Sequence, residues 1–423
     1  MIGHNFFILA LFFFFYSLIV SEKVNRSIVA MLGAATYMLL RVIDQKEAIH
    51  FIDFNTIGLL LGMMILVDII KRTGIFEFLA IHLIKLSKGN SFKLLVILAV
   101  TTAFLSAILD NVTTVFIIVP ITIALAAVAK MNPMPYILME IFASNIGGTM
   151  TLIGDPPNII IGSAAHLSFL SFINHNFIPV VLVLIFYIAI IYFLFRKSLK
   201  INSNVKEILA QFDESKIVKD MVFLKRSLTV FIITIILFMT HSLHGLDPAS
   251  IALMSAFVLL LVTKVKPEEV FKEVDYVSLF FLVGIFILVG VLEHEHILAS
   301  VATYISSLTQ GSLLGSMVTT LWVSAIASAF LDNIPLTTVF VPIINSMMEV
   351  AQIKSQVLWW ALSLGACFGG NGSLVGAAAN IIVIGIAKKN NIHISFWDFL
   401  KIGFPLMIMS LVISTIYLYF RFF

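Results

Sequence analysis

Charged residues are scarce in this chain. Lys, Arg, Asp and Glu make up 12% of its 423 residues, whereas about 25% is usual for a soluble domain. Hydrophobic residues make up 60%, and the mean hydropathy is +1.08. Several apolar runs reach or approach the roughly 20 residues that a helix needs to cross a hydrocarbon core. The composition excludes an ordinary soluble domain and predicts an all-α polytopic membrane protein.

Cysteine is almost absent. The single residue, Cys367, excludes an internal disulfide and a cluster of thiolate ligands. One thiol can bind trivalent arsenic, but a small packing residue is the simpler interpretation. We predict no cofactor and no resident metal ion, and the net charge of +3 gives no indication of a nucleic-acid partner.

The chain does contain an internal repeat. An offset of 222 residues aligns its halves without a gap, so that "SAILDNVTTVFIIVPI" (106–121) falls on "SAFLDNIPLTTVFVPI" (328–343). The same offset places "SNIGGTMTLIGDPPN" (144–158) on "ACFGGNGSLVGAAAN" (366–380). Apolar composition raises the chance of a matching Ile or Leu, but not of matching Asp-Asn, Gly-Gly or Pro. The sequence therefore predicts a duplication.

Each half is predicted to have three apolar helices, a polar-tipped pair of short segments, an interrupted helix and a final helix. In the first half these segments lie at about 6–20, 27–43, 56–70, 92–128, 136–165 and 177–195. The resulting organisation is a first repeat at 1–195, a hydrophilic linker at 196–226 and a second repeat at 227–423.

The basic residues predict the orientation, because Lys and Arg favour the cytoplasmic side of a membrane. The N-terminus is placed outside, and the 92–128 pair returns to the side from which it starts. All 26 lysines and arginines then fall on one side except Arg41, Lys46, Lys354 and Arg421. Each half makes five net crossings, so the second half is inverted. We expect a prokaryotic plasma (inner) membrane protein with a cytoplasmic linker and both termini outside.

Two matching aspartates lie within apolar sequence. Asp110 and Asp332 each precede an asparagine, Asn111 or Asn333. A charged aspartate is costly in hydrocarbon, so each must face water, an ion or a partner. Both residue types also cap helix N-termini, where free N–H groups are available. An interfacial turn is the alternative, but it has no need for a carboxylate in both copies. We expect both tips to line a binding site, with Thr113 and Thr337 beside them.

The interrupted helices supply further candidate ligands. Paired glycines release the backbone in both copies, and Pro156 and Pro157 restart a helix in the first. Unwound backbone at membrane depth is buried in protein or lines a cavity, and freed carbonyls can bind a cation. Kinks that serve helix packing alone are the alternative. The predicted site residues here are Ser144, Asn145, Gly147, Gly148, Thr149, Thr151, Asn158, Gly369, Gly370, Asn371, Ser373 and Asn380.

One carboxylate is not duplicated, because Asp155 aligns with Ala377. Asp155 could be a proton carrier, a sodium ligand or a helix N-cap, and each role places it near the site. We expect no Lys or Arg beside these motifs within the membrane. A cavity with three aspartates favours a cation, a proton or a neutral hydroxylated species over an organic anion.

Two other polar groups are predicted to serve the surface. Asp68 lies one helical turn from Lys71 and Arg72, which indicates an interfacial ion pair. "EHEH" (293–296) resembles a metal-binding tract but aligns with the basic stretch 71–74, so a solvated turn is predicted.

The motifs resemble those of the arsenite permease, NhaD-type sodium–proton antiporter and P-protein group. This group belongs to the ion transporter superfamily, which also contains citrate and dicarboxylate carriers. The stretches "SNIGGTMTLIGDPPNIIIG", "LDNVTTVFIIVP", "LDNIPLTTVFVP" and "GGNGSLVGAAAN" carry the resemblance. It implies two inverted repeats of five transmembrane helices, each with a re-entrant helical hairpin and a broken helix. A homodimer is common in the group. Carboxylate-carrying relatives have Ser-Asn-Thr at the hairpin tips, where this chain has Asp-Asn.

We expect a secondary transporter that works by alternating access, coupled to a proton or sodium gradient. The expected activity is efflux of arsenite or antimonite, or sodium–proton exchange, with Asp110, Asp155 and Asp332 as carriers of the proton or cation. Coupled transport of an inorganic or organic anion such as citrate or a dicarboxylate is the alternative.

Two alternatives to a carrier are a protease and a channel, and the sequence is also compatible with an ATPase partner. An intramembrane aspartyl protease is one alternative, but the Gly-x-Gly-Asp motif of that class is missing at Asp155, which follows Leu152-Ile153-Gly154. A channel of the same fold would be separated from a carrier by flux that does not saturate. An ATPase subunit that converts the permease into a pump is compatible with the sequence. The chain is not predicted to be an enzyme.

Overall fold

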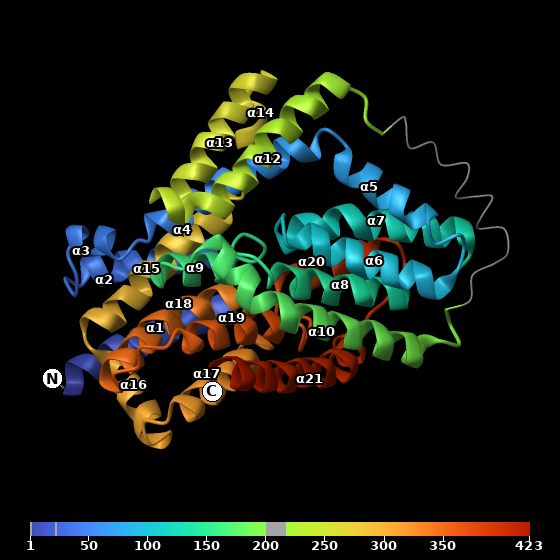
Figure 1. Ribbon diagram of the computed structural model, residues 1–423. Helices are drawn as coiled ribbons and strands as arrows, with labels where there is room; N and C mark the ends of the chain where they lie inside the picture. Colours follow the sequence, from blue (N-terminus) through green and yellow to red (C-terminus); the bar gives the residue numbers. More distant parts are fainter. Residues whose placement is uncertain (1, 22, 200–216) are drawn as a thin grey trace.

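The computed structural model describes residues 2–21, 23–199 and 217–423, which form helices joined by turns and contain no strand (Figure 1). By length and composition, seven of the described helices can cross a membrane. The number is eight if the bent pair Ile297–Leu308 and Leu313–Ser328 counts as one span. The prediction of an all-α polytopic membrane protein is confirmed.

The helices of the two halves follow one another in the same order. The first half contains α1 (Ile2–Ser21), α2 (Arg26–Leu39), α3 (Gln45–His50), α4 (Phe54–Lys71), α5 (Ile75–Lys85), α6 (Ser91–Ser106), α7 (Asn111–Ala129), α8 (Met134–Gly148), α9 (Pro156–Ala164) and α10 (Phe169–Phe195). The second contains α12 (Met221–His244), α13 (Pro248–Thr263), α14 (Pro267–Phe271), α15 (Tyr276–His294), α16 (Ile297–Leu308), α17 (Leu313–Ser328), α18 (Asn333–Val350), α19 (Val357–Gly369), α20 (Ala378–Lys389) and α21 (Phe396–Phe422).

Four helices differ from the expectation. Helix α10 begins eight residues early, because the Ser168 side chain caps it by accepting from the Ser171 N–H at 3.2 Å. Helices α5 and α16 lie outside the predicted apolar segments, and α5 buries one face through Phe76, Ala80 and Ile84. Helix α12 begins inside the predicted linker 196–226, of which 200–216 lie outside the described residues.

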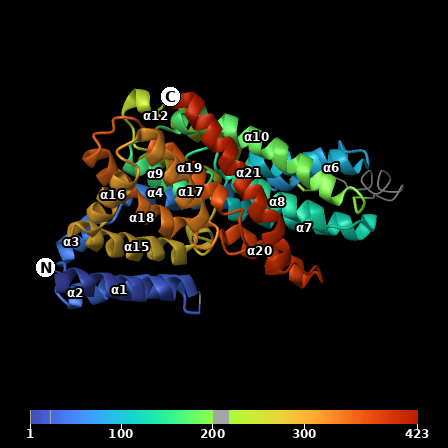
Figure 2. The same ribbon diagram turned by 90° about the horizontal axis from the view of Figure 1, so that it is seen from below.

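Two sets of three packed helices each combine helices from both halves of the chain. Helix α2 packs on α15 and α1, and α13 packs on α4 and α12. Figure 2 shows α1, α2 and α15 together at one edge of the molecule, and Figure 1 shows α12 and α13 projecting together beside α4. Each set therefore joins two helices of one half to one helix of the other. A reciprocal exchange of this kind is the mark of a two-fold relation.

Two glycines set the distance within these sets. A Cβ on Gly62 would lie 2.6 Å from the Ala252 carbonyl carbon, and a Cβ on Gly284 would lie 2.6 Å from that of Ala30. The offset of 222 residues maps one contact onto the other, so the same contact occurs twice. Small residues let helix backbones approach closely in a membrane. The duplication seen in the sequence is thus repeated in the packing.

The remaining helices bring the polar motifs together. Helices α6 and α7 form one hairpin and α17 and α18 the other, and each hairpin packs on the broken helix that follows it. Helix α7 also contacts α20, and α18 contacts α9, so each hairpin reaches the broken helix of the other half. The predicted hairpins and broken helices are confirmed as elements of the fold.

Replacing Gly62 by Ala should lower the thermal unfolding midpoint of the detergent-purified protein. The added Cβ meets the backbone of α13, and overpacking of this kind costs about 1–3 kcal/mol. Gly284→Ala should act in the same way on α2. Gly385→Ala is the control, because a Cβ added there would meet no described atom within 4 Å apart from its chain neighbours and its own helix backbone. Equal midpoints for Gly62→Ala and Gly385→Ala would contradict the close approach.

Candidate functional site

Each hairpin tip is a helix N-terminus capped by an aspartate. Asp110 caps α7, where its carboxylate accepts from the Thr113 N–H at 2.7 Å and from the Thr113 hydroxyl at 2.5 Å. Asp332 caps α18 by accepting from the Ile334 N–H at 3.2 Å. Pro335 aligns with Thr113 and has no N–H to donate, so the second cap uses the preceding residue.

The two tip asparagines converge on Asp155. Asn333 Nδ2 donates to both carboxylate oxygens of Asp155, at 3.2 and 3.4 Å, and Asn111 Nδ2 lies 3.5 Å from Oδ1. Asp155 is fully buried at the start of α9. Its side chain makes no capping hydrogen bond there, although the residue occupies the N-cap position. The unduplicated carboxylate therefore lies where both hairpins meet.

The asparagine that ends each motif closes the helix break. Asn158 Nδ2 lies 3.4 Å from the Gly148 carbonyl, 3.1 Å from that of Thr149 and 2.8 Å from that of Thr151. In the second break the corresponding amide of Asn380 donates to two carbonyls, those of Gly370 at 2.8 Å and Ser373 at 2.9 Å. Unpaired carbonyls are costly at membrane depth. One asparagine in each half thus bonds carbonyls that the glycines release, and in the first break Asn176 Nδ2 also donates to the Thr149 carbonyl at 2.8 Å.

The two breaks lie against each other. Asn145 Nδ2 donates to Asn371 Oδ1 at 2.9 Å and to Asn380 Oδ1 at 3.0 Å. At the position that matches Asn145, the buried Cys367 Sγ lies 3.7 Å from Asn158 Oδ1. The thiol thus takes part in the contact between the breaks.

Small residues bring each hairpin close to its own break. A Cβ on Gly147 would lie 2.1 Å from the Ala103 carbonyl oxygen, and a Cβ on Gly369 would lie 2.5 Å from that of Ala325. Hydroxyl groups donate across the same surface to backbone carbonyls, from Ser106 to Ser144, from Ser328 to Ala366, from Thr151 to Ala107 and from Ser373 to Ala329. Gly147 and Gly369 serve close packing here.

A cavity of about 480 Å³ lies between the hairpin tips and the helices α2, α4 and α15. Six of the predicted site residues line it: Asp110, Asn111, Thr113, Asp155, Asp332 and Asn333. The others lie behind its wall, within the breaks and hairpins: Ser144, Asn145, Gly147, Gly148, Thr149, Thr151, Asn158, Thr337, Gly369, Gly370, Asn371, Ser373 and Asn380. The carboxylates and tip amides thus face the cavity, while the break residues hold the backbone.

The cavity contains cations that the sequence did not predict there. Arg26 Nη1 forms an ion pair with Asp332, and its Nη2 lies 3.4 Å from Ser278 Oγ. Lys71 also lines the cavity. The expectation of a cavity without Lys or Arg is therefore wrong. It failed because Arg26 precedes the apolar run of α2, and the fold brings it to a hairpin 306 positions away in sequence.

Glu140 is a buried carboxylate that the sequence analysis missed. It lies in α8, is fully buried and accepts a hydrogen bond from the Thr122 hydroxyl of α7. Its Oε2 has no partner among the described residues, and Glu140 does not line the cavity. The signal that could have found it is a lone glutamate within "ILMEIFASN", because intramembrane carboxylates often mark functional sites.

The two polar groups assigned to the surface lie as expected. Asp68 Oδ2 forms an ion pair with Arg72 Nη2 at 2.8 Å. In the "EHEH" tract, Glu293, His294 and His296 are exposed. The predicted ion pair of Asp68 is confirmed, and Asp68 also borders the cavity. The predicted turn is confined to 295–296, because Glu293 and His294 end α15.

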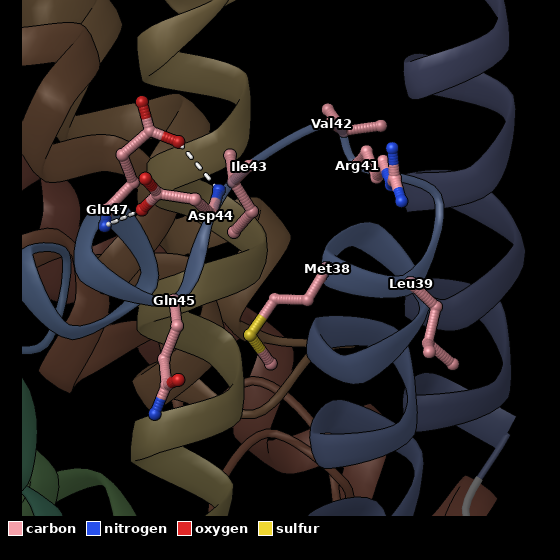
Figure 3. A pocket seen from close by; sticks show the side chains of 8 residues that line it. All are labelled: Met38, Leu39, Arg41, Val42, Ile43, Asp44, Gln45 and Glu47. Carbon is pink, nitrogen blue, oxygen red and sulfur yellow. Dashed lines mark hydrogen bonds between the residues drawn. The ribbon is translucent and has the colours of Figure 1, made fainter.

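A second concavity lies at the corner between α2 and α3 (Figure 3). It measures about 760 Å³, and its carboxylates belong to Asp44 and Glu47. Asp44 Oδ1 accepts from the Glu47 N–H at 2.8 Å, and Glu47 Oε2 accepts from the Asp44 N–H at 2.7 Å. These carboxylates form a capping box for α3, and none of the predicted site residues lies there.

Replacing Asn380 by Ala should lower the thermal unfolding midpoint and impair the function of the site. It removes the side-chain hydrogen bonds to two carbonyls of the second break, of which that of Ser373 keeps the Gly376 N–H at 3.4 Å, and a buried group that loses its partner costs about 1–3 kcal/mol. Asn390→Ala is the matched control, because that exposed amide donates to the Ile386 carbonyl of its own helix and lies outside the breaks. An unchanged midpoint for Asn380→Ala would refute the structural role.

Known proteins resemble this chain over most of its length. Residues 16–365 match the family described as citrate transporter (CitMHS). The chain is 35% identical to the 46 kDa membrane protein of Mycobacterium leprae over 413 residues, which cover 96% of each chain. It is 36% identical to an uncharacterized transporter of Mycobacterium tuberculosis over 414 residues, again 96% of each. The human P protein is 31% identical over 488 residues, which cover 95% of this chain and 58% of that protein.

A solved structure shares the fold. The YdaH transporter of Alcanivorax borkumensis superimposes with a TM-score of 0.58 at 13% identity, over 86% of this chain and 85% of that one. The resemblance to the ion transporter superfamily is thus confirmed by sequence, and the architecture is that of a known transporter fold. The chain belongs to the citrate transporter (CitMHS) family and is an integral membrane transporter.

Proposed function

We propose that this protein is a secondary active transporter in which a proton or sodium ion binds at the cavity aspartates. The substrate is arsenite or antimonite, which it exports, or it exchanges sodium for protons. The observation that carries the proposal is the environment of Asp155. This buried carboxylate borders the cavity, and the hydrogen bonds it accepts from Asn111 and Asn333 come from neutral amides.

A buried carboxylate without a cation is unstable unless it is protonated. Asp155 is therefore suited to take up a proton or a small cation from the cavity. Because both hairpin tips donate to it, a change in its charge changes how strongly both hairpins are held. This gives a physical link between ion binding and movement of the hairpins.

Alternating access requires a second route to the site. A smaller cavity of about 260 Å³ lies at the other end of α9, bordered by Ser163, His166 and His241. Ile159, in the middle of α9, lines both cavities. We propose that the segment around Ile159 separates the two sides, and that movement of the hairpins and breaks exposes the site to each in turn.

The orientation is a further part of the proposal. The cavity at the hairpin tips is bordered by Arg26 and Lys71, which the distribution of basic residues assigns to the cytoplasm. The linker 196–226 is assigned to the same side, and the repeats are taken as 1–195 and 227–423.

Cysteine labelling should test this orientation. In Lys71→Cys, a membrane-impermeant maleimide should react in inside-out vesicles and not in intact cells, because Lys71 is exposed on the proposed cytoplasmic side. Lys46→Cys should react in intact cells. The native Cys367 is fully buried and supplies the unreactive background. Labelling of Lys71→Cys in intact cells would contradict the proposed orientation and indicate the opposite one.

Coupled transport of an anion such as citrate or a dicarboxylate is the second candidate. The observation in its favour is the presence of Arg26 and Lys71 at the cavity, in a member of the citrate transporter family. Arg26 already has Asp332 as its counter-charge, which favours the cation hypothesis. The transporter relatives give no support to the aspartyl protease alternative. A homodimer and an ATPase subunit stay predictions.

Transport by the purified protein in liposomes should decide between the substrates. Uptake of arsenite, sodium, citrate and phosphate is compared under imposed pH and sodium gradients. Asp110→Ala and Asp155→Asn should each reduce coupled flux to that of empty liposomes, because each removes a cavity carboxylate that is free to bind an ion. Asp332→Ala should do the same because it leaves the Arg26 charge in the cavity without its counter-charge.

Asp44→Asn is the control for this experiment, since Asp44 belongs to the capping box away from the cavity. It should transport like the unmodified protein. Full coupled flux in Asp110→Ala and Asp155→Asn would contradict the proposed ion-binding role. Citrate uptake without any response to arsenite or sodium would favour the second candidate.

A further inference from the structure

The two hairpin tips have the same aspartate but not the same charge balance. Asp110 and Asp332 occupy matching positions, and both cap the following helix. Asp332 also forms an ion pair with Arg26, whereas no described Lys or Arg lies within ion-pair distance of Asp110. One tip thus carries a cation that belongs to the protein, and the other does not.

The surroundings of Arg26 are specific to the second tip. Its guanidinium carbon lies 5.0 Å from the centre of the Phe281 ring, and Ser278 Oγ is 3.4 Å from Nη2. The offset of 222 residues places Pro248 where Arg26 stands and Leu59 where Phe281 stands. Neither can bind or support a cation as its counterpart does. The aspartates were thus kept in both copies, while the cation and its supporting ring occur in one.

Arg26 also stands where a cation is unfavourable by itself. It is the first residue of α2, and the N-terminus of a helix carries partial positive charge. Asp332 supplies the opposite charge, with 19% of its side chain exposed against 27% for Arg26. Since both groups are mostly shielded from water, their attraction is stronger than that of an exposed surface pair.

We propose that Arg26 acts as a tethered cation that fills the second hairpin tip and leaves one coupling-cation site, at Asp110 and Asp155. The proposal rests on the proposed function, in which a proton or sodium ion binds at the cavity aspartates. It adds the number of sites and names Arg26 as the residue that sets this number. Removing the charge of Arg26 frees Asp332, so that a second proton or sodium ion can bind.

The number of bound ions can be read from unfolding. An ion that binds the folded protein raises the unfolding midpoint with its concentration, and the slope against the logarithm of concentration reports how many ions are bound. The full chain in detergent is titrated with sodium chloride, with choline chloride added to hold ionic strength constant. The same variants are compared between about pH 5 and pH 8 without sodium, where the difference in slope between a variant and the unmodified protein reports the change in the number of protons bound on folding.

The expected slope of the unmodified protein corresponds to one ion. Arg26→Gln should raise the number of bound ions that the slope reports to two, whereas Arg26→Lys should keep this number at one. Arg26→Gln combined with Asp332→Asn should return the number to one. Lys266→Gln is the control, because it removes a cation from beside the exposed Glu269, which does not line the cavity, and it should leave the slope at one ion. Asp110→Asn should abolish the slope.

Each result bears on a distinct statement. An unchanged slope in Arg26→Gln, or a slope of two in the unmodified protein, overturns the tethered-cation proposal and leaves the proposed function intact. If Arg26→Gln does not fold, Asp110→Asn still decides, because a retained slope of one shows that the ion binds without the first tip. The absence of any sodium or proton dependence in the unmodified protein contradicts the proposed function itself.

Discussion

Backbone carbonyls that are released inside a membrane must find their hydrogen bonds within the protein, because hydrocarbon supplies none. This constraint shapes the centre of the molecule. Asn158 and Asn380 each satisfy the carbonyls of one break, and Asn145 joins the two breaks by donating to Asn371 and Asn380. The breaks can exist only because these amides are in place, and the hairpins pack on the surface that they form.

Contacts that occur in both halves and charged residues that occur in one half have different roles in this structure. Contacts that occur twice, such as Gly62 with Ala252 and Gly284 with Ala30, hold the two halves in their reciprocal arrangement. Residues that occur once carry charge into that arrangement: Asp155 lies between the hairpin tips, and Arg26 lies on one of them. A symmetric frame with unsymmetric charges can hold different partners at its two tips.

The hairpins, the breaks and the capping role of Asp110 and Asp332 could be predicted because their signals are local. Gly-Gly, Asp-Asn and the proline pair act on their own backbone within a few residues. Helices α5 and α16 were missed because, at 11 and 12 residues, they are too short to be read as membrane-spanning runs. The division of the candidate site into cavity-lining and break-holding residues could not be predicted, since Asn111 and Asn145 are the same residue type in similar polar stretches.

The sequence by itself determined the membrane class, the repeat and the set of polar residues at its centre, because composition and periodic offsets need no knowledge of contacts. Tertiary structure alone decided which of these residues face the cavity and which hold the backbone. It also decided that Arg26 meets Asp332, because an ion pair depends on distance in space, and these residues are 306 positions apart in the chain. Charge balance at the site is a property of the packed helices and cannot be read from either motif alone.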